Sequence, residues 1–255
     1  MARHRPPRNM SSSSTKVFAI LDLFTGERPV WQPDEINETL GYTRPTGYRY
    51  VKELVEAGML QKISAGRYAL GGRIIELDFQ LRQTDPVLSA SVPVMKDLAA
   101  RTGYDAVLSV LYAGPKVIDI HRVSGEKGLE LLYGRGRPRP MFRAGAPKVL
   151  LAWLARGPLL KIFEAHKEEI AANGMGDSWA QFRAKLTHIR QTGYYRSTGE
   201  LQAGVGAMAV PVLNREQDCV GTLALVGSSS RIDTESSETL YALLREATLL
   251  IGTSL

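Results

Sequence analysis

The chain has 255 residues, of which 44% are hydrophobic and 23% charged, values typical of globular proteins. That length exceeds one typical domain and favours two. No apolar run approaches the roughly 18–20 residues needed to cross a bilayer, and no apolar stretch of a secretory signal follows the basic residues 1–8. We therefore expect a cytoplasmic protein. The single cysteine, Cys219, excludes an internal disulfide framework and a cysteine-based zinc site.

The formal net charge is +6 at pH 7. Residues 1–82 carry 12 Lys and Arg against 9 Asp and Glu, and the rest of the chain carries 20 against 17. Each part therefore has an excess of three positive charges, and the shorter part has the higher charge density. A dense positive charge suits a nucleic-acid partner, although many basic proteins never bind DNA.

Three helices are expected after a basic, serine-rich tail at residues 1–13. Apolar residues at helical spacing predict the first helix over 15–25. The second begins at Pro33, which is favourable at a first helical position, and stops at Gly41. Thr43 can cap the third helix. Two helices joined by a short turn that contains glycine have the geometry of a helix-turn-helix.

The third helix is expected to have an inward face and a DNA-binding face. The inward stripe is predicted at Tyr48, Val51, Leu54 and Val55. A recognition helix needs hydrogen-bond donors near its N-terminal half and small residues where the backbone comes close to DNA. Residues 59–63 and 67–70, separated by a turn at 64–66, predict a two-stranded wing. The predicted DNA-binding residues are Thr43, Arg44, Thr46, Gly47, Tyr48, Arg49, Lys52 and Arg67.

Segments 43–49, 54–58 and 66–74 resemble the isocitrate lyase regulator (IclR) family of bacterial transcription regulators, most specifically in the Gly-x-Tyr-x-Leu-Gly-x-Arg wing signature. The resemblance covers nearly the whole chain after residue 14. It implies a homodimer or homotetramer that binds near-palindromic double-stranded DNA operators. The expected fold is α+β: a winged helix-turn-helix at 14–72, a linker helix at 73–85 and a GAF-like α/β effector-binding and oligomerisation domain at 86–255. The linker helix could instead pack onto its own domain.

The second domain shows two hairpins among helices, which is typical of an α+β sheet domain. Strands are expected at 106–112 and 117–122 and, most clearly, at 205–213 and 219–226. Helices are expected at 147–155, 159–172 and 178–191, and from about 233 to the carboxyl end. The basic loop 135–140 is expected to be solvated. Residues 199, 200 and 204 are expected to form a structural turn.

Segment 141–148 is the expected effector site. Small residues let a ligand approach the backbone, and the helix that follows offers free N–H groups and a positive dipole end to an anion. Arg143 could hold a carboxylate with two hydrogen bonds, but the small residues could instead serve only for tight packing. The family resemblance implies effector contacts at Arg143, Ala144, Gly145, Ala146, Ser197, Ala207, Ala224 and Val226.

These positions are mostly apolar, which favours an aromatic or longer carboxylate over a two- or three-carbon keto acid. We therefore expect a repressor or activator whose binding to DNA is controlled by a small organic acid from catabolism. An alternative is a constitutive DNA-binding protein whose C-terminal domain only oligomerises. An enzyme is disfavoured because no nucleophile–base pair, phosphate-binding loop or dinucleotide motif is present, and we expect no catalytic site, metal or cofactor.

Overall fold

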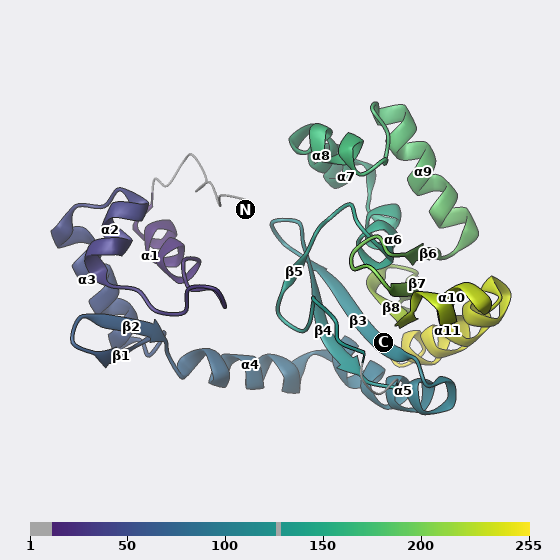
Figure 1. Ribbon diagram of the computed structural model, residues 1–255, viewed down its shortest axis with the longest axis horizontal. Coiled ribbons are helices and arrows are strands. Elements are labelled where there is room, and N and C mark those ends of the chain that lie inside the picture. The colour runs from purple at the N-terminus through teal and green to yellow at the C-terminus, as the bar shows by residue number, and fades with distance from the viewer. Residues whose placement is uncertain (1–11, 126–128) are drawn as a thin grey trace. The chain divides into compact units, whose positions relative to one another are not determined.

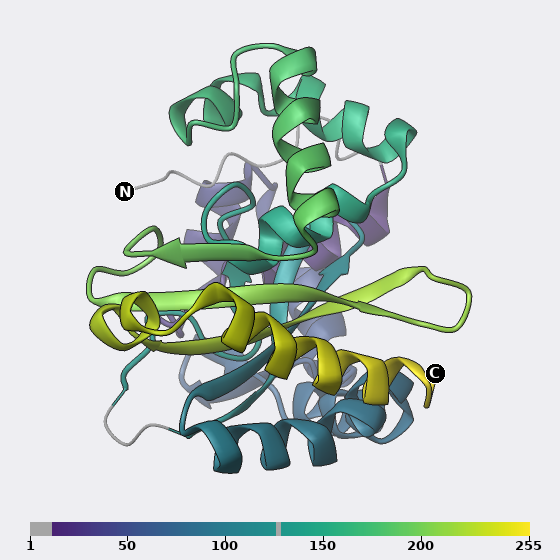
Figure 2. The same cartoon turned by 90° about the vertical axis from the view of Figure 1, so that its right-hand side faces the viewer.

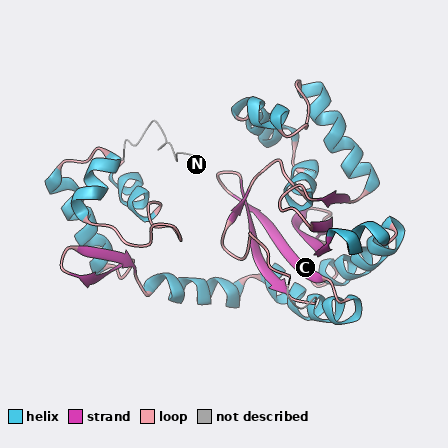
Figure 3. Cartoon of the chain, viewed as in Figure 1, coloured by secondary structure: helices cyan, strands magenta, loops and turns pink. Residues whose placement is uncertain are grey.

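The computed structural model describes residues 12–125 and 129–255. Backbone contacts divide the chain into two compact units, one that ends at Thr84 and one that spans Asp85–Leu255. Both units contain helices and strands (Figures 1 and 3), which confirms the expected α+β class. None of the described helices is long and apolar enough to cross a membrane.

The N-terminal unit begins with three helices, as expected. The elements of the unit are α1 (Ser13–Leu21), α2 (Pro33–Leu40), α3 (Arg44–Glu56), β1 (Leu60–Ser64), β2 (Arg67–Leu70) and α4 (Arg73–Thr84). The first helix starts earlier than the predicted 15–25, because the side chain of Ser12 caps it by accepting a hydrogen bond from the backbone N–H of Thr15. It also ends earlier, at Leu21.

The turn between α2 and α3 has the geometry of a helix-turn-helix. The carboxylate of Glu35 accepts a hydrogen bond from the backbone N–H of Gln32 (2.8 Å) and secures the start of α2 beside Pro33. The helix ends at Gly41, whose φ of 68° lies in the left-handed region that glycine adopts without strain. Thr43 occupies the cap position of α3, but its hydroxyl donates to the hydroxyl of Thr46 instead of accepting from the helix backbone.

The rotation of α3 about its axis differs from the prediction. Tyr50 is 3% exposed and packs in the core of the unit, whereas Tyr48 is 41% exposed. The prediction of Tyr48 as an inward residue is therefore wrong. Gly47 is also buried, and a Cβ at this position would lie 1.5 Å from Oδ1 of Asn37 on α2. The inward stripe includes Gly47, and a stripe that begins with a residue lacking a side chain is easily missed.

The wing is a two-stranded antiparallel hairpin in which Leu60 pairs with Leu70. A short third segment joins it, because Trp31 forms an antiparallel bridge with Tyr68 that the sequence did not predict. The indole N–H of Trp31 donates to the carbonyl of Leu23 (2.9 Å), which ties the segment before α2 to the end of the α1 region. This bridge positions the wing against the three helices.

Helix α4 follows the wing and has no buried residue. Several of its apolar side chains are open to solvent, with 74% of Ile75, 62% of Phe79 and 53% of Leu81 exposed. The alternative that this helix packs onto its own domain is therefore wrong for the chain taken alone. The apolar surface of α4 has no partner within its own unit.

The C-terminal unit is a six-stranded sheet with helices on both faces. Its helices are α5 (Pro86–Thr102), α6 (Gly145–Trp153), α7 (Arg156–Ala165), α8 (Lys167–Ala172), α9 (Trp179–Thr192), α10 (Ser229–Thr234) and α11 (Ser237–Gly252). Its strands are β3 (Asp105–Tyr112), β4 (Lys116–Val123), β5 (Pro138–Arg139), β6 (Tyr195–Thr198), β7 (Val205–Leu213) and β8 (Cys219–Ser228). All neighbours pair antiparallel in the order β5-β4-β3-β8-β7-β6.

Alternation along the strands separates two hydrophobic cores, because successive side chains point to opposite faces of a sheet. Met208 and Leu223 belong to the core that packs under α5 and α11. Ala209 and Ala224 belong to the core on the opposite face, together with Phe142 and residues of α6 and α9. Figure 2 shows these two pairs of helices on opposite sides of the sheet. The second face, with its small residues, carries the expected effector site.

Four predicted features of this unit need correction. The helix expected over 159–172 is divided into α7 and α8 at His166, whose backbone leaves the helical region. The final helix starts at Ser237, capped by Ser236, after the separate short helix α10. Strand β6 was not predicted. The basic loop 135–140 is not fully solvated, because Arg139 lies in β5 and is paired with a buried aspartate.

Candidate functional site

The exposed face of α3 carries a stripe of basic and aromatic side chains. Arg44, Tyr48 and Lys52 are four residues apart and therefore lie on one side of the helix. Arg49 lies beside them and is also exposed. The guanidinium group of Arg44 lies 5.5 Å from the centre of the Tyr48 ring. This surface has donors where a recognition helix needs them, and these residues stay predicted DNA contacts.

The basic side chains of α3 form weak ion pairs, including one between Arg44 and Asp34 of α2 (3.3 Å). Arg49 lies 3.7 Å from Glu53, and Lys52 lies 3.6 Å from Glu56. Both pairs are largely exposed, and exposed pairs of this kind contribute only about 0–1 kcal/mol each. The cations can therefore exchange these partners for phosphate groups at little cost.

The other predicted DNA-binding residues have mixed positions. Thr43 and Arg67 are exposed, the first in front of α3 and the second at the start of β2, next to the wing turn. Thr46 is partly exposed. Gly47 is buried against α2, where the small residue serves the packing of two helices, and its contact with DNA stays a prediction.

In the C-terminal unit, the segment before α6 adopts an unusual conformation at Ala144. Its φ of 62° and ψ of −177° lie in a region that almost only glycine adopts. This conformation lets the backbone N–H of Ala144 donate to the Oε2 atom of Glu200 (2.9 Å). The N-terminal end of α6 therefore already holds a carboxylate, and that carboxylate belongs to the protein.

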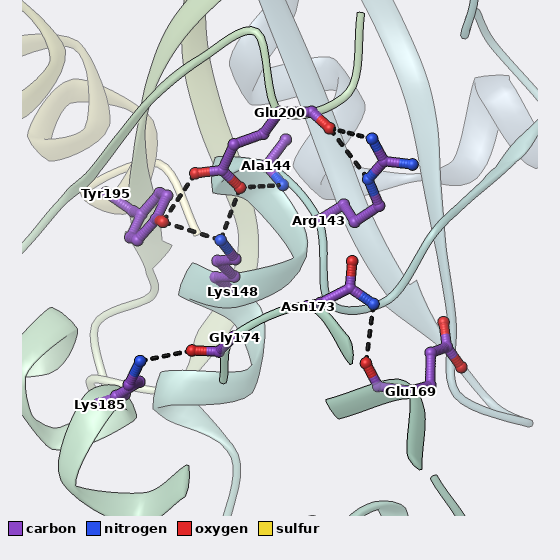
Figure 4. Close-up of polar contacts among 9 residues, drawn as sticks. All are labelled: Arg143, Ala144, Lys148, Glu169, Asn173, Gly174, Lys185, Tyr195 and Glu200. Atoms are coloured by element: carbon purple, nitrogen blue, oxygen red, sulfur yellow. Dashed lines mark hydrogen bonds and ion pairs between the residues drawn. The ribbon is translucent and has the colours of Figure 1, made fainter. Parts of the chain in front are cut away.

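Glu200 collects three more contacts at this point (Figure 4). Nζ of Lys148 lies 2.6 Å from Oε2, and the Tyr195 hydroxyl donates to Oε1 at 2.8 Å. Nζ of Lys148 also donates to the Tyr195 hydroxyl (2.8 Å). Arg143 does not reach the carboxylate: its Nε donates to the backbone carbonyl of Glu200 (2.9 Å). Both the side chain and the main chain of Glu200 are thus fixed to the segment that begins α6.

These contacts perturb the ionisation of the cluster. Burial alone would raise the pKa of Glu200, but the hydrogen bonds from Lys148 and Tyr195, the charge of Lys148 and the Ala144 N–H together hold that pKa below its ordinary value. Burial and the neighbouring carboxylate raise the pKa of Tyr195. At neutral pH the site therefore contains a carboxylate and a neutral phenol, paired with a lysine that is 5% exposed.

Two hollows adjoin this cluster. A cavity of about 40 Å³ is lined by several predicted effector residues, and a cleft of about 1020 Å³ is lined by Arg143 and Lys148 together with residues of α9. Glu200 lines both. The small cavity is lined by four residues that were predicted to contact the effector: Ala144, Ser197, Ala207 and Val226.

The remaining predicted effector residues do not line the small cavity. Arg143 faces the larger cleft. Gly145 packs tightly, because a Cβ there would lie 3.0 Å from Cβ of Ala209. Ala146 and Ala224 are buried in the core. These three small residues therefore serve tight packing, which was the alternative expectation, and do not line the small cavity.

A second ion pair borders the small cavity. Nε of Arg139 lies 2.6 Å from Oδ1 of Asp119, Nη2 lies 2.7 Å from Oδ2, and both side chains are nearly fully buried. The hydroxyl of Ser109 also donates to Asp119 (2.6 Å). Arg139 therefore reaches the cavity wall with its charge already compensated. Among the described residues, no group of three or more His, Cys, Asp and Glu side chains could hold a metal ion.

Comparison with known proteins identifies both units. The family model described as "Bacterial transcriptional regulator IclR C-terminal" matches residues 80–253, and that described as "IclR helix-turn-helix domain" matches residues 13–64. The chain belongs to the IclR family. The resemblance inferred from the wing signature is confirmed, and the chain is a transcriptional regulator with a DNA-binding helix-turn-helix and an effector-binding domain.

Individual relatives of the IclR family are distant but match over nearly the whole chain. The HTH-type transcriptional regulator XynR of Escherichia coli is 26% identical over 95% of this chain and 96% of its own. A crystal structure of an IclR transcriptional regulator from Silicibacter sp. has a TM-score of 0.79 at 23% identity, covering 94% of this chain and 95% of its own. An IclR homologue from Microbacterium hydrocarbonoxydans, crystallised with 4-hydroxybenzoate, has a TM-score of 0.75 at 23% identity, covering 96% of this chain and 99% of its own.

The central cluster of the effector-binding domain was missed by the sequence reasoning. Glu200 was assigned to a structural turn, and Lys148 was read only as part of the helix start. They are 52 residues apart in the chain, so no local pattern joins them. The available signal was weak: Lys148 is the one charged residue within the otherwise apolar first half of a buried helix, and such a residue needs a partner.

Proposed function

We propose that this IclR-family regulator binds a double-stranded DNA operator through α3 and the wing, and that a small organic acid, most simply an aromatic carboxylate, controls this binding. The observation that carries the effector part is the start of α6, where the Ala144 N–H and Lys148 bind the carboxylate of Glu200 beside a wall of small apolar residues. A carboxylate fits the first feature, and an apolar body fits the second. Residues Ala144, Ser197, Ala207 and Val226 are the proposed effector contacts.

The 4-hydroxybenzoate in the complex of the Microbacterium homologue supports an aromatic acid as the starting point for this chain. The same fold there accommodates a ring with one carboxylate. The mostly apolar residues at the proposed contact positions favour such a ligand over a short keto acid, because an unpaired polar group in an apolar cavity is unfavourable.

The effector proposal is tested by thermal unfolding of the purified protein with a panel of acids: benzoate, 4-hydroxybenzoate, an aliphatic acid and pyruvate. A ligand at about a hundred times its dissociation constant adds about 2.7 kcal/mol of stability, an easily detected shift. We expect the aromatic acids to give the largest shift. A shift with pyruvate alone would contradict the proposed ligand class.

The DNA proposal rests on the exposed Arg44, Arg49 and Lys52 of α3 and on Arg67 at the wing. Fluorescence anisotropy with the DNA upstream of the protein's own gene measures the affinity directly. We expect the affinity to fall steeply with salt concentration, because phosphate contacts release counterions. Addition of the stabilising acid is expected to change this affinity, since a ligand that favours one conformation must shift binding at the other site.

One observation favours a second function. The small cavity is only about 40 Å³, and the cationic groups near it are paired with Glu200 and Asp119. This supports a constitutive regulator whose C-terminal domain only oligomerises. That protein would show no stabilisation by any acid and an unchanged operator affinity in its presence.

A homodimer or homotetramer is part of the proposal in either case. The exposed Ile75, Phe79 and Leu81 of α4 support assembly, because exposed apolar side chains on one helix are best covered by another protein surface. Sedimentation velocity over a range of protein concentrations distinguishes a monomer, a dimer and a tetramer. A monomer at all concentrations would overturn this part.

A further inference from the structure

We propose that the carboxylate of Glu200 is a built-in occupant of the effector's anion site, and that an effector acid binds by replacing it at the start of α6. This inference rests on the proposed acid sensor and names the residue that competes with the acid. It makes Glu200 a residue that determines both the affinity of the site and its selectivity for carboxylates.

Glu200 already uses the donors that an acid would need. The Ala144 N–H, the Lys148 ammonium group and the Tyr195 hydroxyl all contact its two carboxylate oxygens, at 2.6–2.9 Å. This donor set is that of a small carboxylate site: a helix N-terminal N–H, one buried cation and one hydroxyl. The protein supplies both the site and the ligand.

The charge of Glu200 opposes the binding of an acid next to it. With Glu200 in place, an acid at the small cavity would put a second negative charge beside the first, with one lysine to share. Two carboxylates in such a position repel each other strongly, and one must leave or take up a proton. Arg139 does not change this balance, because it is paired with Asp119. An effector acid and the Glu200 carboxylate therefore exclude each other.

The small cavity has no room for an aromatic ring while Glu200 is in place. A cavity of about 40 Å³ has room for only a few water molecules, at about 10–15 Å³ each, whereas ligand cavities measure about 300–1000 Å³. Glu200 and the two residues that follow it, Leu201 and Gln202, form part of its wall. Moving this segment is therefore the direct way to make room for an aromatic ring.

Two glycine residues bound the segment that carries Glu200. It joins β6 to β7 and is bounded by Gly199 (φ 68°) and Gly204 (φ 76°), which adopt their conformations without strain. The displaced side chain also has a place to go, since Glu200 already lines the cleft of about 1020 Å³. That cleft is bordered by the basic residues Arg143, Lys185 and Arg196. The displaced carboxylate of Glu200 would therefore leave Lys148 and still lie near basic side chains.

The main experiment compares the parent protein with Glu200→Gln, which keeps the shape of the side chain and removes its charge. Isothermal titration measures binding of 4-hydroxybenzoate, benzoate and pyruvate, with 4-hydroxybenzamide as the neutral probe. We expect the preferred acid to bind Glu200→Gln at least about tenfold more tightly, because a like charge next to the ligand has gone. The amide is expected to bind both proteins alike.

A matched control is Glu246→Gln, which removes the same charge from an exposed ion pair between α11 and α5, on the opposite face of the sheet from α6. It is expected to leave acid affinity unchanged. Equal acid affinity in the parent and in Glu200→Gln would overturn the displacement while the acid sensor stands. If no acid of the panel binds either protein, the acid sensor is wrong and the displacement falls with it.

A second variant keeps the test independent of the effector and of the fate of Glu200→Gln. Glu200→Ala removes the carboxylate and leaves a space the size of acetate beside Lys148. Acetate is expected to raise the melting temperature of this variant in a saturable way, whereas acetamide or sodium chloride at equal concentration does not. The parent and Glu246→Ala serve as controls. Absence of rescue by acetate would overturn the inference.

Discussion

The two units hold their charged groups in opposite ways. On α3 the basic side chains are exposed, and so are their acidic partners, which lie one helical turn away or, for Arg44, on the neighbouring helix α2. At the start of α6 the lysine is buried, and its partner comes from a distant loop. The basic side chains of α3 can exchange their acidic partners for phosphate groups without rearrangement. At the start of α6, the loop that carries Glu200 must first move away. The DNA-binding unit is therefore prepared for its ligand, whereas the effector-binding unit is occupied by a part of itself.

The largest effect is expected when the helix packing that presents α3 is disturbed. In Gly47→Leu the added side chain collides with the side chain of Asn37, so this buried side chain must be displaced or α2 and α3 must separate. We expect the N-terminal unit to lose about 3 kcal/mol of stability and operator binding to become undetectable by anisotropy. Acid-induced stabilisation of the C-terminal unit is expected to persist.

Gly72→Leu is the control, because the space around Gly72 is open and its backbone conformation suits any residue. Its operator affinity should stay close to that of the parent protein. Normal operator binding by Gly47→Leu would show that the packing of α2 and α3 does not determine the position of the recognition surface.

The next largest effect is expected in the C-terminal unit. Lys148→Met keeps the length of the side chain and leaves the carboxylate of Glu200 without a cation. Breaking a buried pair in this way is expected to lower the free energy of unfolding by about 2–3 kcal/mol, less than for a fully buried pair because Glu200 is partly exposed. Urea unfolding followed by tryptophan fluorescence measures the change.

Lys167→Met is the matched control, since Lys167 pairs with Glu164 (2.6 Å) on an exposed surface. Exposed pairs contribute about 0–1 kcal/mol, so the control should hardly change the stability. Equal effects of the two substitutions would contradict the contrast between exchangeable and fixed ion pairs.

A smaller effect sharpens the description of the DNA-binding unit. Arg49→Ala removes one exposed cation from α3, and we expect about tenfold weaker operator binding with a salt dependence reduced by about one counterion. Acid affinity should not change. The control Arg101→Ala removes a comparable exposed arginine from the C-terminal unit. A folded Arg49→Ala protein that loses both activities equally would contradict the separate role of α3.

The smallest expected effect is the dependence of stability on pH. The pKa of Glu200 is lower in the folded protein than its ordinary value of 4.5. Ionised Glu200 therefore stabilises the fold above that value, and this contribution is lost as the pH falls through the lowered pKa of the folded state. We expect the difference in unfolding free energy between the parent and Glu200→Gln to shrink below pH 4.5. A difference that grows on acidification would contradict the direction of the shift.

Much of the fold could be predicted because local residues determine it. Pro33 and Gly41 mark the ends of α2, and alternating small and large residues mark β7 and β8. The phase of α3 was wrong because Tyr48 and Tyr50 are both aromatic, and the face that packs inward begins with a glycine. The third segment of the wing was missed because the Trp31–Tyr68 bridge joins residues that are distant in the chain.

The two candidate sites differ in the same way, because one is formed by neighbouring residues and the other by residues that are distant in the chain. The residues of the DNA-binding surface lie within one short helix, so their grouping followed from helical spacing. The effector cluster joins Ala144, Lys148, Tyr195 and Glu200 from three separate segments. Family resemblance indicated the helix start and the apolar strand positions, but it did not indicate that a residue of the chain itself holds the anion site.

The exposure of helix α4 has a consequence for its stability. The helix has 12 residues and no buried side chain. An isolated helix of up to about 12–15 residues is only marginally stable in water, because forming the first turn is unfavourable and few further residues follow to offset that free energy. In a lone chain the segment should therefore fray toward coil, and its ordered state should be a product of assembly. A linker that has lost its helical structure cannot pass a conformational change from one unit to the other. We therefore expect that, on dilution, the acid no longer changes operator affinity although both units are still folded.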